Sequence, residues 1–474
     1  MYRRLSCLIL IFVIVDLSSA LDARQSQILN LNYRYGFNIG DNLKDVYYKT
    51  IEQVKANKEL NSKQFNSESI KKHIDILNRY YPDYIKRLEG LADVLNVPLE
   101  KLIETHLKIA SIFNYGCTNM ACAKTATKDG KNYVTWNADF YASFKILFPI
   151  AFDLPLYTLT DVEGSNRYMT MGIPLIAGFG HLNDKGLGLT TSAVHSEDNG
   201  SGLTVFELTS MVMEKCSDVP CAVKTIESLP RASSPVSSLF TSNYLLVDSL
   251  GNIATVEATH NYFAVNYGEN GILAQANHHQ FLDRALSGGL GPDNNGYPSS
   301  WIRAGRAWDL LKDNYGNIDI TMLETFTTDT ENGINIMGKN IGGNNSISRN
   351  MFPFGWLDYY AGSLTGKYYY MGKPAAFADP VILLPDQTDF SIIIDVNDKV
   401  IWWAGGHPGV VKHLPIYCAK YLGTKGGTLS EKDSDSAKML NRYVETMVNL
   451  GTITNYIPEN LRGNLSALIN GLLQ

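Results

Sequence analysis

The sequence predicts an α+β fold built in layers, and three patterns lead to this prediction. Apolar residues recur at helical spacing through residues 21–114. After Cys117 the chain changes to short extended runs separated by turn residues. Further helical segments interrupt these runs, so helices can cover a sheet. With 474 residues, 45% hydrophobic and 19% charged, the chain can bury a large core.

The predicted elements follow in chain order. Leu43, Tyr47 and Val54 share one helix face, Pro98 marks a break, and residues 99–113 form another predicted helix. Beyond residue 117, extended segments are expected at residues 133–140, 145–157, 167–176, 186–194, 242–247, 253–257, 262–265, 390–395 and 400–404, and helices at 204–215, 220–229, 302–314 and 437–448. Helices on both sides of such strands indicate a layered domain.

The N-terminus has the pattern of a signal peptide. Arg3 and Arg4 precede an apolar run at residues 7–15, and Ser18 and Ala20 are small residues suited to cleavage after Ala20. The apolar run is too short to span a bilayer, which takes about 20 residues. We therefore expect residues 1–20 to be a signal peptide and the protein to be secreted or lysosomal. Glycosylation sequons at Asn199, Asn344 and Asn464 are consistent with this route.

Charge narrows the range of partners. The net charge of −6 and the isoelectric point near 5.9 argue against nucleic acid as a partner. No later segment reaches membrane-spanning length without polar interruptions, so stable membrane insertion is not expected.

The cysteines predict a free thiol. Removal of Cys7 with the signal peptide leaves five cysteines, and an odd number in an oxidising compartment leaves at least one unpaired. We expect Cys117 to be unpaired. Cys216 and Cys221 flank a predicted helix break at Asp218-Val219-Pro220, where a turn would bring them within disulfide distance, although the sequence does not determine the pairing.

Cys117 stands in a context that suits nucleophilic catalysis. It follows Gly116, whose lack of a side chain leaves the preceding peptide bond sterically open. If the chain were cut there, the new α-amino group would titrate near pH ~8 and serve as a base for the thiol. Asp129-Gly130 predicts a tight hairpin turn, which would bring Cys117 next to Asp139, a carboxylate suited to holding the ammonium group. An isolated buried cysteine is the simpler alternative.

Several motifs occur in a characteristic order. They are Tyr33-Arg34-Tyr35-Gly36, Leu88-Glu89-Gly90-Leu91-Ala92-Asp93-Val94, Gly116-Cys117-Thr118, Asn137-Ala138-Asp139-Phe140, Asn183-Asp184-Lys185-Gly186-Leu187-Gly188, Ala276-Asn277-His278 and Ser299-Ser300-Trp301-Ile302-Arg303. In this order they resemble the acyl-coenzyme A:isopenicillin N acyltransferase-like family of N-terminal-nucleophile cysteine hydrolases. That family is related to choloylglycine hydrolases and acid ceramidase.

The resemblance implies a four-layer αββα sandwich that cuts itself before Cys117. Residues 21–116 would be a helical prosegment or small α-chain, and residues 117–474 the β-chain of an α/β heterodimer. Cys117 would be the nucleophile, its α-amino group the base, and Asp139 the group that orients the amine. Asn277 would donate to the tetrahedral oxyanion and Arg303 would support the site, with Arg306 as the substitute if the alignment shifts by one turn.

Two positions depart from the family pattern. Trp136 replaces an Arg or Gln of the relatives, and Ser192 replaces an Asn of the acyltransferases. We place both, with Asn137 and His195, around the substrate. Trp136 would then form an apolar wall and Ser192 would supply one hydrogen-bond donor, while a buried core histidine is the alternative for His195.

The predicted function is hydrolysis of linear N-acyl amides or lipid amides through a Cys117 thioester, with acyl transfer where an amine replaces water. No cofactor or metal is expected, because His278 and His279 alternate across a strand and face opposite sides. A papain-like protease fits less well, for lack of a convincing His/Asn pair. A phospholipase B-type lipid ester hydrolase and a non-catalytic binding protein on the same fold remain alternatives.

Overall fold

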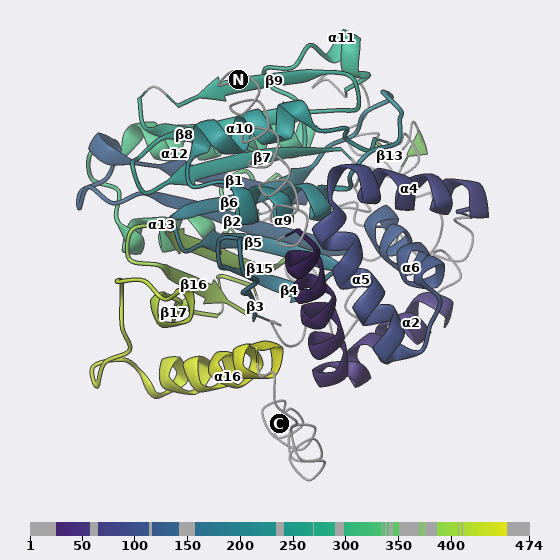
Figure 1. Ribbon diagram of the computed structural model, residues 1–474. Helices are drawn as coiled ribbons and strands as arrows, with labels where there is room; N and C mark the ends of the chain where they lie inside the picture. Colours follow the sequence, from purple (N-terminus) through teal and green to yellow (C-terminus); the bar gives the residue numbers. More distant parts are fainter. Residues whose placement is uncertain are drawn as a thin grey trace, which may run out of the picture.

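The molecule is built from two antiparallel sheets packed face to face between helices. The computed structural model describes residues 25–56, 65–112, 116–141, 157–233, 241–268, 270–289, 298–333, 335–336, 339–340, 345–349, 369–370, 373–374, 386–405, 407–409 and 411–452. The larger sheets have six and seven strands, and helices lie on the outer face of each (Figure 1). The predicted four-layer αββα sandwich is confirmed.

The six-stranded sheet carries Cys117. Its strands, in spatial order, are β10 (Ile272–Gln275), β1 (Gly116–Cys122), β2 (Tyr133–Tyr141), β15 (Asp386–Asp395), β16 (Val400–Ala404) and β17 (Leu414–Tyr417). Helices α12 (Pro298–Asp313) and α13 (Ile320–Thr327) pack on its outer face. The inner face of β1 and β2 packs against the second sheet, so the strand that begins at the candidate cleavage point lies in the middle of the protein.

The seven-stranded sheet follows chain order. Its strands are β3 (Tyr157–Thr160), β4 (Tyr168–Ile173), β5 (Ala177–Asn183), β6 (Leu187–Ala193), β7 (Ser242–Asp248), β8 (Ile253–Ala258) and β9 (Phe263–Tyr267). Helices α9 (Val205–Lys215) and α10 (Val219–Ser228) cover its outer face, and α16 (Asp435–Thr452) packs on the edge strands β3 and β17. Helix α9 begins with a capping box between Thr204 and Glu207.

The N-terminal helices form a separate group beside the sheets (Figure 1). They are residues 25–42, α2 (Lys44–Ala56), α4 (Ser67–Tyr80), α5 (Pro82–Leu95) and α6 (Leu99–Ile112). Two of the sequence motifs meet here. A Cβ on Gly36 would lie 1.8 Å from the carbonyl oxygen of Arg87, and one on Gly90 would lie 2.1 Å from that of Tyr33. Only glycine allows these helices to approach at backbone distance.

Smaller elements complete the described structure. They are a 3-10 turn (Lys124–Ala126), α11 (Arg284–Ser287), α15 (Ala419–Leu422), and the two-stranded pairs β11 (Asn335–Ile336) with β12 (Lys339–Asn340) and β13 (Tyr369–Tyr370) with β14 (Lys373–Pro374). Within the described residues, no helix combines the length and apolar character needed to cross a bilayer.

Local sequence signals located most of the longer elements, but β3 was predicted only at its first residue, Tyr157, and the short elements α11, α15 and β11–β14 were not predicted. The predicted strand at 400–404 is confirmed, and helix α9 starts one residue after the predicted start. Strands β5, β10 and β17 and helix α13 were not predicted. Gly178 and Gly180 made β5 resemble a turn, and Pro415 had the same effect on β17. The predicted strand at 145–157 lies almost wholly outside the described residues.

Among the described residues one disulfide is present, between the two cysteines whose pairing the sequence allowed but did not determine. Cys216 and Cys221 are bonded, with a Cα–Cα distance of 5.3 Å, because α9 ends at Lys215 and Asp218 caps α10. Cys117 is unpaired, as predicted, and it shares this state with the buried thiols of Cys122 and Cys418.

Of the predicted signal peptide and the three predicted glycosylation sites, the structure describes Asn199. The signal peptide, Asn344 and Asn464 lie outside the described residues. Asn199 is exposed, as a glycosylation acceptor must be.

Candidate active site

Cys117 and Asp139 are neighbours on paired strands. The hairpin turns at Gly130, whose φ of +71° suits glycine, and β1 pairs with β2 in a register that sets Gly116 opposite Asp139 and Cys117 opposite Ala138. The hairpin predicted from Asp129-Gly130 therefore brings the two residues together as expected.

Side chains alternate between the two faces of this hairpin. On the outer face, Asn137 Nδ2 donates to the carbonyl oxygens of Thr327 and Ile347 at 2.8 and 3.0 Å. On the inner face, Asn119 Nδ2 donates to Ser192 Oγ of the second sheet. Cys117 shares the inner face with Asn119 by alternation, so its thiol and the Asn137 side chain point away from each other. Asn137 anchors neighbouring loops and does not line the space beside the thiol.

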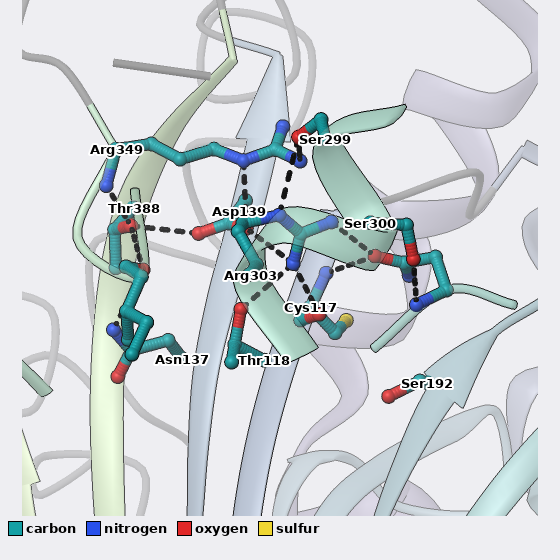
Figure 2. A network of polar contacts seen from close by, with 12 residues as sticks. Cys117, Thr118, Asn137, Asp139, Ser192, Ser299, Ser300, Arg303, Arg349 and Thr388 are labelled. Atoms are coloured by element: carbon teal, nitrogen blue, oxygen red, sulfur yellow. Dashed lines mark hydrogen bonds and ion pairs between the residues drawn. The ribbon is translucent and has the colours of Figure 1, made fainter. Parts of the chain in front are cut away.

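Arg303 and Asn277 hold the backbone of Cys117 from both ends (Figure 2). The Cys117 N–H donates to Asn277 Oδ1 at 2.8 Å, and the Cys117 carbonyl accepts from Arg303 Nη1 at 2.5 Å. Arg303 also donates to Thr118 Oγ1 at 2.7 Å and to Asn277 Oδ1 at 2.8 Å. Arg303 is only 1% exposed, so these charge-assisted bonds form away from water.

The amide donor of Asn277 is engaged with another group. Asn277 Nδ2 donates to the carbonyl of Ala193 at 2.9 Å, and its backbone N–H donates to Ser300 Oγ at 2.7 Å. The structure therefore places the Asn277 side chain at the Cys117 nitrogen, with its donor turned to the second sheet. This differs from the oxyanion role expected from the family resemblance.

Asp139 lies between two arginines. Its Oδ2 is 3.0 Å from Arg349 Nε and 3.8 Å from Arg303 Nη1, and its Oδ1 accepts from Thr388 Oγ1 at 2.6 Å. Asp139 is fully buried, and Figure 2 shows the two guanidinium groups on the same side of the strand. The site therefore holds two cations around one carboxylate.

Arg349 also explains the glycine at position 116. A Cβ on Gly116 would lie 2.6 Å from Arg349 Cζ, so a larger residue would displace the guanidinium group from Asp139. Sequence reasoning missed Arg349 and Thr388, because each is far from Asp139 in the chain and stands in no motif. Ser299 lies one helical turn before Arg303, and residues at this spacing are neighbours on a helix surface. Arg303 Nε accordingly donates to Ser299 Oγ at 3.3 Å.

The Cys117 thiol is protonated at neutral pH. Burial raises the pKa of the thiol to about 12, and the charge of Asp139 acts in the same direction, while the Trp136 side chain and Arg303 oppose this rise. Activation of this sulfur therefore requires a base in direct reach.

Trp136 forms part of an aromatic wall beside the thiol. Its ring stacks on Phe179 at 5.4 Å and meets Phe390 edge-on at 5.2 Å. Its Nε1 is buried and has no nitrogen or oxygen acceptor within the described structure, and it lies beside the Cys117 thiol. An unpartnered buried donor is costly and suits a ligand that supplies an acceptor.

The other predicted residues have separate partners. Ser192 Oγ also lies 3.5 Å from Gln275 Nε2. His195 is half buried, and the hydrogen bonds of the Cys117 network do not include it. His278 Nδ1 contacts Ser300 Oγ at 2.7 Å, whereas His279 Nδ1 contacts Asn243 Oδ1 at 3.2 Å. The two histidines therefore have different surroundings, but they lie in a bend after β10 and not in the strand that was predicted for them.

Arg303, and not Arg306, is the arginine of this site. Arg306 lies one turn further along α12 and pairs with Asp329 at 2.7 Å. The substitute assignment is therefore unnecessary.

Comparisons with known proteins were made on the sequence and on the fold. The family model of acyl-coenzyme A:6-aminopenicillanic acid acyl-transferases matches residues 127–345, a region that holds Asp139, Asn277 and Arg303 but begins after Cys117. A mutant of conjugated bile acid hydrolase from Clostridium perfringens is 14% identical, covers 67% of this chain and 98% of its own, and has a TM-score of 0.34. Penicillin V acylase from Agrobacterium tumefaciens is 13% identical, with coverages of 64% and 87% and a TM-score of 0.31. No curated protein matches significantly.

Proposed function

From the membership of residues 127–345 in the acyl-coenzyme A:6-aminopenicillanic acid acyl-transferase family, we propose that this protein is an N-terminal-nucleophile amidohydrolase with Cys117 as the nucleophile. The family resemblance inferred from the sequence is confirmed by that match. The observation that carries the proposal is the clamp on Cys117, whose nitrogen and carbonyl oxygen are held by Asn277 and Arg303. Such a clamp fixes both the sulfur and the adjacent nitrogen.

The first reaction is cleavage of the chain before Cys117. The sulfur attacks the carbonyl carbon of Gly116, a C–S bond forms, the C–N bond breaks, and the thiol proton moves to the departing nitrogen. Water then hydrolyses the thioester and leaves a Gly116 carboxylate and a free α-amino group on Cys117. Asn277 Oδ1, which accepts from the Cys117 nitrogen in the intact chain at 2.8 Å, would keep this amine in place.

The free amine is the base that the buried thiol needs. Arg303 binds the Cys117 carbonyl and Asn277 Oδ1, and its charge would disfavour a further positive charge on the amine, while Asp139 would limit this effect. The amine takes the thiol proton as the sulfur attacks the substrate carbonyl, and it returns the proton to the leaving nitrogen. Water resolves the acyl-thioester, and an amine in its place gives acyl transfer.

Trp136 is our candidate for the oxyanion donor. The Asn277 Nδ2 donor is already engaged with Ala193, whereas Trp136 Nε1 is buried beside the thiol and has no nitrogen or oxygen acceptor among the described residues. The aromatic wall that Trp136 makes with Phe179 and Phe390 supports an apolar acyl group on the substrate. We therefore propose N-acyl amides, including lipid amides, as the substrate class.

The experiment compares wild type with Cys117→Ala and with Cys122→Ala, a matched control at the other end of β1. Intact mass and N-terminal sequencing should show a large fragment that starts at Cys117 in wild type and Cys122→Ala only. The same two proteins should hydrolyse N-acyl amides of varied chain length. Full amidase activity in Cys117→Ala would contradict the nucleophile assignment. Cleavage without amide hydrolysis, but with lipid ester hydrolysis, would favour the ester hydrolase.

Acidification is expected to destabilise the protein, because the buried His413 has to take up a proton on unfolding. Burial lowers the pKa of His413 from 6.5 to about 4. Between these values the unfolded state binds the proton and the folded state does not, so the free energy of unfolding falls as pH falls from 6.5 towards 4. At pH 5 this one residue costs about 2 kcal/mol.

Chemical denaturation of wild type and His413→Asn between pH 7.5 and pH 4.5 tests this expectation. The variant should lose less stability than wild type on acidification, by roughly 2 kcal/mol at pH 5. Equal losses of stability in the two proteins would mean that the pKa of His413 is the same in the folded and unfolded states.

A further inference from the structure

Three ligand-type side chains converge where the N-terminal helices meet the body of the protein. His73 comes from α4, His106 from α6 and Glu207 from α9, and their exposed fractions are 6%, 1% and 0%. The ligand atoms of the three residues all lie within 4.8 Å of one another. The three residues are widely spaced in the sequence, so no sequence motif indicated that they come together.

The three ligand atoms lie close enough to bind one small cation if His73 Nε2 withdraws from Glu207 Oε1 by about 0.5 Å. His73 Nε2 lies 2.8 Å from Glu207 Oε1, and His106 Nε2 lies 3.2 Å from the same oxygen. Ligand atoms around a tetrahedral zinc ion, each about 2.0–2.1 Å from the metal, are about 3.3 Å apart. Two imidazole nitrogens and one carboxylate oxygen make a donor set that zinc prefers.

The outer contacts orient two of the ligands. His106 Nδ1 lies 2.8 Å from the carbonyl oxygen of Ile176, which only accepts, so Nδ1 carries a hydrogen and Nε2 is the ring nitrogen left to bind a metal. Glu207 Oε2 accepts from the Thr204 N–H at 2.7 Å, which leaves Oε1 directed at the histidines. His106 Nε2 lies 3.2 Å from Glu207 Oε1 and 3.2 Å from Thr204 Oγ1, so two oxygens stand beside the nitrogen that would bind the ion.

The cluster also contains a buried carboxylate whose partners are the two histidines. Glu207 is fully buried, and its ion pairs among the described residues are with His73 and His106. An isolated buried carboxylate is expensive.

We propose that His73, His106 and Glu207 bind a structural zinc ion that ties α4 and α6 to α9. Both helices lie before Cys117, and α9 lies after it. The ion therefore bridges the two fragments that cleavage would produce. The bridging role rests on the proposed cleavage, whereas the metal site does not.

The test measures zinc content and thermal stability of the full-length protein. Wild type, expressed with zinc and dialysed against metal-free buffer, should retain about one zinc per chain. His73→Gln and His106→Gln should each retain at least tenfold less, and His181→Gln, a buried histidine outside the cluster, should match wild type. Uncut Cys117→Ala should also bind zinc as wild type does, which separates this proposal from the cleavage.

Wild type alone supplies a second measurement if the variants fail to fold. A strong chelator should lower its Tm, and zinc, but not magnesium, should restore the Tm. Wild type without bound transition metal, and with a Tm that does not respond to zinc, would overturn the proposal. A protonated histidine would then balance Glu207.

Discussion

Replacement of Arg303 with methionine is expected to lower amide hydrolysis by roughly 10²- to 10³-fold, the usual loss for one charged or hydrogen-bonding group at a reacting centre. Arg303 holds the Cys117 carbonyl and Asn277 Oδ1 and lies 3.8 Å from Asp139. Methionine removes these bonds, and both the sulfur and its neighbouring nitrogen lose their fixed position. Self-cleavage should slow as well, because it uses the same geometry.

Arg306→Met is the matched control for this prediction. Arg306 lies on the same helix and pairs with Asp329, where its side chain is 28% exposed. Partly exposed pairs contribute about 0–1 kcal/mol, so this variant should keep near-wild-type activity and cleavage. Steady-state kinetics on an N-acyl amide and the fraction of cleaved chain measure both effects. Equal activities in the two variants would remove Arg303 from the site.

Replacement of Arg87 with methionine is expected to destabilise the protein by about 3–5 kcal/mol. Arg87 on α5 forms a bidentate pair with Glu214 on α9, and the two side chains are 1% and 0% exposed. Its Nε also donates to Asn32 at 2.6 Å. Methionine would leave the Glu214 carboxylate buried without its cation, and this unpaired charge is the main cost.

A neighbouring ion pair controls for the loss of charge between the same two helices. Lys215 pairs with Asp83 at 3.3 Å, with side chains 45% and 19% exposed, so Lys215→Met should cost less than about 1 kcal/mol. The double variant Arg87→Met with Glu214→Leu should recover part of the stability, since it removes the unpaired charge. Denaturant unfolding measures all three variants. A loss below 1 kcal/mol in Arg87→Met would mean that water reaches Glu214.

The local sequence determined the hairpin on which the site is built. Asp129-Gly130 between two extended runs is a short-range turn signal, and the period-2 alternation of strands then fixes which residues oppose each other. The proximity of Cys216 and Cys221 depends on equally local features, because α9 ends at Lys215 and Asp218 caps the start of α10. Such signals act over a few residues, so they can be interpreted without the fold.

The sequence motifs located several residues of the candidate site but did not predict which atoms their side chains contact. Arg303 was selected over Arg306 only by alignment with a family pattern, and the structure shows why it lies at Cys117. Asn137 lies next to the candidate site in sequence, yet strand alternation turns its side chain to the other face. The Asn277 amide donor, expected at the oxyanion, is engaged with Ala193. Chain position alone does not specify which atoms a side chain meets.

By itself, the sequence determined the layered α+β class, the Cys117–Asp139 hairpin, the free thiol of Cys117 and the helical segment that precedes it. Only the tertiary structure brought Arg349 and Thr388 to Asp139, and His73 and His106 to Glu207. These partners lie on different elements, and packing of whole sheets and helices sets their distances. No short-range pattern encodes such contacts, because the free energy that forms them comes from burial of surfaces contributed by distant parts of the chain.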